Sequence, residues 1–170
     1  MLGPALAGVD GNTEDRSDTV SVFNGPPPNI LILIDAAEES SFVGRWLADC
    51  IGAGIMPHEI GVLVRSAAQI ARAEEAVRVA GLPYQILDVR VATELDHVSV
   101  GTLNLAQGLE FRAVAAIACA DEVIPLQQRL ESVGDDGDLR EVYDTERHLL
   151  HVASTRARDR LLVIGINPAS

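Results

Sequence analysis

The sequence predicts an α/β domain of three layers, in which a mainly parallel sheet lies between helices, and two observations lead to this prediction. Short apolar runs of strand type alternate with segments of helical periodicity, which is the pattern of strands joined by crossover helices. Of the 170 residues, 48% are hydrophobic but only 4% are aromatic. Val, Leu, Ile and Ala must therefore build the core, as expected for parallel strands covered on both faces. This length suits one well-buried core, so we expect a single domain.

The strands follow from apolar runs and from alternation. Residues 1–18 are rich in Gly, Asp, Asn and Ala without periodicity, so we expect a flexible lead-in there and the domain itself over 19–168. The strand-type segments within the domain are Thr19–Phe23, Asn29–Ile34, Glu59–Arg65, Tyr84–Leu87, Val98–Leu103, Ala113–Cys119 and Leu161–Ile166.

Three segments predict helices. Asp35 stands three residues before Glu38, a capping-box arrangement that opens the first helix. Ser66 with Gln69 opens the second helix. The third is expected over Val142–Arg158, with acids early and arginines late, as the helix macrodipole prefers.

The charge of the chain excludes two classes of protein. A net charge of −12 argues against a free-standing nucleic-acid clamp, because such clamps bind through cations that displace counterions. Any contact with DNA must be local. All thirteen basic residues are Arg and none is Lys. The phosphate-binding loop of an NTPase needs a Lys after its glycines, so the chain does not contain that loop in its usual form.

The cysteines, the hydropathy and the acidic stretch of the sequence predict neither a metal site nor a membrane location. Cys50 and Cys119 lie far apart without the spacing of metal ligands, so we expect two buried thiols in a reducing cytoplasm and no metal site. No apolar run approaches the roughly 20 residues of a membrane span, and no signal pattern is visible, so we expect a cytoplasmic protein without a membrane partner. The acidic stretch Asp135–Asp138 lacks the register of a calcium loop and predicts a solvated loop.

The first motif with possible chemistry is GTLNLAQGLEF, from Gly101 to Phe111. Gly108 would let the backbone approach a ligand closely, and Glu110 would place a carboxylate at the carboxyl edge of the sheet, where α/β folds bind ligands. The spacing alone is equally compatible with a turn glycine and a solvated charge.

The second motif is ERHLLHVASTRARDRLLVIG, from Glu146 to Gly165, which we interpret as a helix that ends in arginines and returns to a buried strand. Arg156, Arg158 and Arg160 would satisfy the last carbonyls and the negative end of the helix dipole. Alternatively, they contact phosphate, for which the guanidinium fork is well suited.

Together, the two motifs in this order resemble motifs V and VI of the UvrD/Rep family of superfamily 1 helicases. The resemblance covers about Thr19 to Asn167 and implies the second RecA-like domain of an ATP-dependent DNA helicase or translocase. It implies that Arg156 is an arginine finger for the ATP γ-phosphate, and that Gly108 and Glu110 belong to the nucleotide site. It also implies that Thr102, Asn104 and, with less support, Arg65 face single-stranded DNA.

The resemblance also implies what lies elsewhere. The phosphate loop and the metal-binding acids belong to the first, N-terminal RecA-like domain, so ATP and Mg²⁺ would be bound only in the complete enzyme. We recognise no motif IV, and Asp121-Glu122 resembles an ordinary loop of the family. Asn104 and Gln107 stand where relatives commonly have His and Lys. The chain alone is expected to be inactive. A detached helicase domain that serves as a non-enzymatic binding or regulatory module is the alternative.

Overall fold

A computed structural model describes residues 5–7, 13–15, 26–88, 94–119, 148, 151 and 155–166. Two α-helices lie within these ranges, α1 (Ala36–Gly52) and α2 (Ile70–Val79), with 3₁₀ turns at η1 (Pro57–Glu59) and η2 (Ala67–Gln69). The strands of the main sheet are β3 (Asn29–Leu33), β4 (Ile60–Val64), β5 (Tyr84–Ile86), β6 (Val98–Thr102), β7 (Phe111–Ala116) and β8 (Ala157–Ile166).

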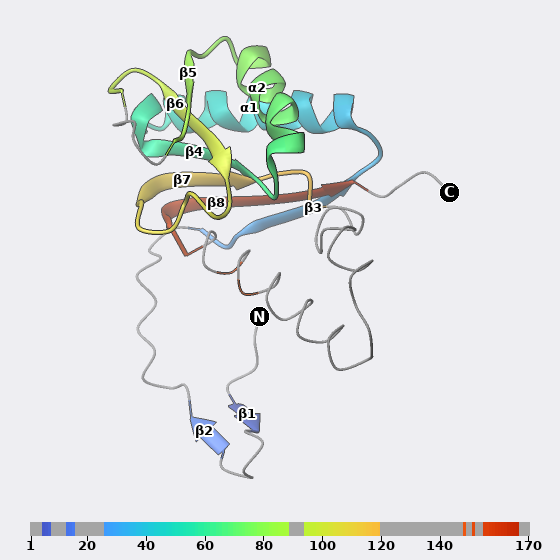
Figure 1. The fold of residues 1–170 in the computed structure, drawn as a ribbon, viewed down its shortest axis with the longest axis vertical. Helices are drawn as coiled ribbons and strands as arrows, with labels where there is room; N and C mark the ends of the chain where they lie inside the picture. Colours follow the sequence, from blue (N-terminus) through green and yellow to red (C-terminus); the bar gives the residue numbers. More distant parts are fainter. Residues whose placement is uncertain are drawn as a thin grey trace.

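The main sheet has the order β3-β8-β7-β4-β6-β5, and every neighbouring pair is parallel (Figure 1). This arrangement confirms the predicted α/β class with a parallel sheet. β4 lies inside the sheet and all five of its residues are buried, which explains its unbroken apolar sequence. β3 and β5 form the two edges. Both α1 and α2 cover the same face of the sheet.

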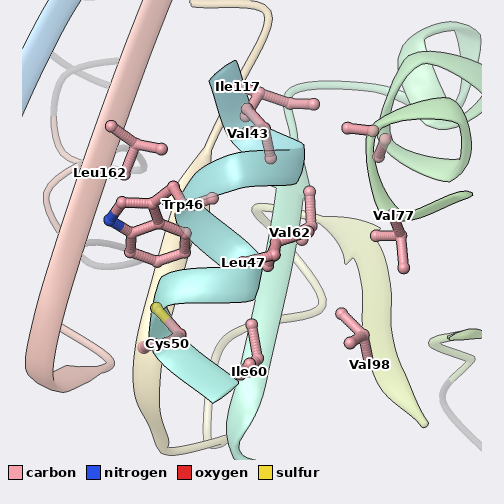
Figure 2. Packing of buried hydrophobic residues seen from close by; sticks show 14 of the residues in the cluster. Val43, Trp46, Leu47, Cys50, Ile60, Val62, Val77, Val98, Ile117 and Leu162 are labelled. Carbon is pink, nitrogen blue, oxygen red and sulfur yellow. The ribbon is translucent and has the colours of Figure 1, made fainter. Parts of the chain in front are cut away.

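The first helix begins where the sequence predicts it. The Asp35 carboxylate accepts a hydrogen bond from Glu38 N–H at 2.8 Å, and the Glu38 carboxylate accepts one from Ile34 N–H at 2.9 Å. The first bond satisfies a donor that a helix start leaves unpaired, and the second ties the residue before the cap to the first turn. The buried side of α1 then packs on the sheet through Val43, Trp46, Leu47 and Cys50, which point toward β4 and β8 in Figure 2.

A buried ion pair joins the two helices to the end of β7. Glu39, in the first turn of α1, is 1% exposed, and its Oε1 accepts hydrogen bonds from Arg72 Nη2 at 2.7 Å and Nε at 3.1 Å. Its Oε2 accepts a hydrogen bond from Ala118 N–H at 3.0 Å. Ala118 has a φ of 57°, a left-handed conformation that a non-glycine residue rarely adopts. The carboxylate thus holds a strained turn of the backbone in place.

The opposite face of the sheet carries a second apolar cluster that includes Leu63, Leu103 and Phe111. One glycine there lies in close packing. A Cβ at Gly61 would lie 3.1 Å from the Phe111 ring, a tight contact, so a larger residue at this position would require the ring to shift.

Several expectations need correction. Most of the third helix expected over Val142–Arg158 lies outside the described residues. Thr155 and Arg156 lie in a turn and β8 begins at Ala157, so no helix reaches Arg158. The pairing of Ala157 with Phe111 of β7 overrides the local helical pattern. β7 likewise occupies 111–116, two residues earlier than the predicted start.

Two expectations concern the start of the chain. Thr19–Phe23 lies outside the described residues. Within the expected lead-in, β1 (Ala5–Ala7) and β2 (Thr13–Asp15) pair as a small antiparallel sheet, for which the composition gives no signal.

Candidate functional site

Three of the predicted residues lie together at the carboxyl edge of the sheet. Arg65 follows β4 and Thr102 ends β6, and these strands are neighbours with Val64 opposite Thr102. Leu103 N–H donates to Val64 C=O at 2.7 Å, which fixes the start of the turn that carries Asn104. Asn104 is exposed, Thr102 is half-buried and Arg65 is only 6% exposed. Thr102 and Asn104 therefore face solvent more openly than Arg65.

The other three residues lie at the opposite, amino edge. Glu110 directly precedes β7 and Arg156 directly precedes β8. Phe111 N–H donates to Arg156 C=O at 2.9 Å, so the backbone joins the two motifs at this point. Gly108 lies close by with a φ of +86°, a conformation that favours glycine. Glu110 is exposed and Arg156 is half-buried.

The position of Glu110 corrects one prediction. Its carboxylate was expected at the carboxyl edge, because the motif begins at the end of strand β6. The turn from Leu103 to Glu110 instead carries the chain back to the start of β7. Since β6 and β7 both run parallel to β4, the end of one and the start of the other lie at opposite edges.

The returning turn is anchored on the sheet. Leu103 and Ala106 are buried in the second apolar cluster, and Leu105 and Leu109 pack against it. Successive backbone bonds, such as Leu109 N–H to Ala106 C=O at 3.1 Å, stiffen the segment. One short, packed segment therefore connects Thr102 at one edge with Glu110 at the other.

The amino edge also holds a charged network that the sequence did not reveal. Between Phe111–Ala157 and Ala113–Arg160, the register of β7 against β8 shifts by one residue, so β8 contains a β-bulge. Asp159 in the bulge accepts a hydrogen bond from Arg112 Nε at 2.5 Å. This bond, with the nearby carboxylates, raises the pKa of Arg112 above its ordinary value.

The rest of the network reaches the far end of α1. Arg112 Nη1 lies 3.4 Å from Gly54 C=O and 3.5 Å from a Glu59 carboxylate oxygen. Arg158 lies exposed on β8 and not at the end of a helix, where it was expected. The sequence ARDRL at the start of β8 does not predict a bulge, which becomes apparent only from the pairing of β8 with β7.

The two thiols are free. Burial raises the pKa of Cys50 to about 11, against the opposing influence of Arg160. Burial, with the Glu39 carboxylate, raises the pKa of Cys119 to about 12. Within the described ranges, no group of three His, Cys, Asp or Glu side chains comes together to hold a metal ion. In the same ranges, no helix is both long enough and apolar enough to cross a membrane.

Comparisons with known proteins bear on the kind of domain. Residues 88–167 match the model of the UvrD-like helicase C-terminal domain. Among solved structures, the C-terminal domain of a possible DNA helicase from Lactobacillus plantarum is similar, with a TM-score of 0.59 and 20% identity. The match covers 88% of this chain and 82% of that one. No curated protein matches the sequence significantly. The family match includes both motifs, and the chain therefore contains a UvrD-like helicase C-terminal domain.

Proposed function

We propose that this chain is the second motor domain of an ATP-dependent DNA helicase or translocase. The observation that carries the proposal is the junction of the two matched motifs at the amino edge, where Phe111 N–H bonds Arg156 C=O. Glu110 and Arg156 are thereby brought to neighbouring strand starts. An exposed carboxylate and a half-buried guanidinium suit one wall of a nucleotide site, with the carboxylate on the ribose and the guanidinium on phosphate.

In this proposal Arg156 acts as an arginine finger. When a P-loop domain closes against the amino edge, the guanidinium would meet the charge that develops on the γ-phosphate during hydrolysis. The complete site requires ATP and Mg²⁺. Because the described residues bring no three metal ligands together and the chain has no Lys, the partner domain would hold the metal and the phosphate tail.

The proposed DNA track lies at the other edge. Thr102 and Asn104 present hydroxyl and amide groups that suit a phosphate or a base of single-stranded DNA. Arg65 shares this edge, but its low exposure gives it the smallest contact of the three. The packed segment from Leu103 to Glu110 would pass a change at the DNA track to the nucleotide wall, because buried Leu103 and Ala106 anchor it in the second apolar cluster.

The test compares the chain alone with a two-domain protein in which a P-loop RecA-like domain precedes it. The chain alone should hydrolyse no ATP above background, while the two-domain protein should show turnover stimulated by single-stranded DNA. ATP turnover by the chain alone would refute the proposal that hydrolysis requires both domains. A two-domain protein that binds DNA but shows no ATP turnover would instead support the non-enzymatic module.

A further inference from the structure

The outer edge of β3 differs from the other edge of the sheet. β3 has five residues without a charge, and within the described residues it pairs only with β8. β5, at the other edge, is three residues long, and its Gln85 side chain accepts a hydrogen bond from Glu94 N–H at 3.0 Å. Natural sheets protect their edges with short strands, charges or covering segments. β5 shows two of these devices, whereas the length and composition of β3 show none.

One face of β3 presents an apolar stripe. Ile30, Ile32 and Ile34 are 72%, 75% and 74% exposed, whereas the intervening Leu31 and Leu33 pack into the core beneath α1. These three isoleucines, the β3 stripe, lie on the face away from α1 and α2. The neighbour of Ile32 on β8 is Gly165, which offers no side chain. Isolated exposed apolar residues are ordinary, but three at alternate positions along one edge strand are not.

The other face of β3 has a pocket beside the same edge. An open pocket of about 370 Å³ lies between Asn29 of β3 and the outer side of α1. Phe42, Arg45 and Trp46 are among its lining residues, and the Arg45 guanidinium lies 5.8 Å from the centre of the Phe42 ring. An extended segment along β3 would thus meet isoleucines on one face and this pocket on the other.

The charges near β3 indicate the chemistry of the occupant. Asp35 and Glu38 are exposed at its carboxyl end, and neither forms an ion pair among the described residues. The whole chain carries a net charge of −12. A second copy would bring the same excess of negative charge, whereas a basic segment would be attracted.

We propose that the outer edge of β3 is a strand-addition site for an extended, basic segment of a partner protein. The backbone of that segment would bond the outward N–H and C=O groups of β3. Alternate apolar side chains would cover the β3 stripe, the others would face the pocket, and a Lys or Arg would reach Asp35 and Glu38. This role is independent of the motor, because β3 supplies none of the residues at the nucleotide wall or the DNA track.

The probe is the peptide acetyl-Lys-Val-Tyr-Val-Thr-Val-Lys-amide, titrated into the isotope-labelled chain and followed by NMR. Binding should shift the amide signals of β3 and β8, with a dissociation constant on the order of 100 μM or below. Two control peptides keep the length. Glu in place of both Lys residues, or methylation of alternate backbone nitrogens, should each weaken binding about tenfold or more.

Matched variants locate the site on the protein. Ile32→Lys should weaken binding about tenfold, while Ile86→Lys, on the other edge strand and 48% exposed, should change it less than about twofold. Glu38→Gln keeps the acceptor for Ile34 N–H and should reduce the salt dependence of binding.

Three results would overturn the proposal. One is the absence of peptide binding to the wild-type chain, and another is equal weakening by the two Ile→Lys variants. The third is a concentration-dependent dimer that Ile32→Lys abolishes and the peptide does not displace, which would make a second copy the occupant.

Discussion

Loss of Arg72 should destabilise the domain far more than loss of an exposed arginine. Arg72→Met keeps a long side chain but removes the guanidinium that donates to Glu39 at 2.7 and 3.1 Å. The carboxylate, 1% exposed, would then keep only the Ala118 N–H bond. Breaking a buried pair in this way costs about 3–5 kcal/mol. Because Arg72 itself is 27% exposed and part of the pair reaches water, we expect the lower end, about 3 kcal/mol.

The matched control is Arg78→Met on the same helix. Arg78 pairs with Glu75 at 2.6 Å, but their side chains are 61% and 52% exposed, so its loss should hardly change the free energy of unfolding. Urea unfolding followed by the fluorescence of Trp46, the single tryptophan, measures both values. If the two variants lose equal stability, the buried pair does not hold the helices and the end of β7 together.

Three further predictions concern the site and the thiols. In the two-domain protein, Arg156→Ala should reduce turnover roughly a thousandfold or more with little change in nucleotide affinity, and Arg158→Ala should do much less; equal losses in stopped-flow and binding assays would reject the assignment. The double change Asn104→His with Gln107→Lys should raise single-strand affinity, its salt dependence and DNA-stimulated turnover, and unchanged titrations would make both residues neutral variation. The raised pKa of Cys119, about 12 against an ordinary 9.0, means that folding favours the protonated thiol. Its stability contribution is complete below pH 9 and is lost as pH rises toward 12, so at pH 8 the half-buried thiol should react with a disulfide reagent more slowly in the folded chain than in the unfolded chain; equal rates would contradict this.

Local signals in the sequence predicted local structure well. The cap at Asp35 depends on residues three apart, so the sequence states it directly, and the bond from Glu38 N–H to Asp35 at 2.8 Å confirms it. The same holds for β4, because a strand buried on both faces must be apolar throughout. The family motifs likewise identified the kind of domain.

The errors arose where distant segments meet. The helix predicted over Val142–Arg158 cannot extend to Arg158, because Ala157 already pairs with Phe111. Glu110 was assigned to the wrong edge, because residue spacing does not show that the turn after β6 returns the chain to the other edge of the sheet. Nothing near Glu39 in the sequence indicates its burial, because its partner Arg72 lies 33 residues away. Registers and partners across the sheet are long-range properties that periodicity does not encode.

The pairing of β3 with β8 also sets the order in which the domain is completed. Asn29 lies opposite Leu162, so the first strand of the sheet finds its neighbour only when the last strand is available. Closing a loop of this length is slow, because the chain loses conformational entropy before the contact between β3 and β8 provides any stabilisation. On the ribosome, α1 and β4 can form their local structure early, but β3 has no paired neighbour until β8 has been synthesised. A nascent chain that stops before Ala157 would leave both β3 and β7 without their shared neighbour, and chaperones would meet unpaired strand edges until synthesis passes residue 166.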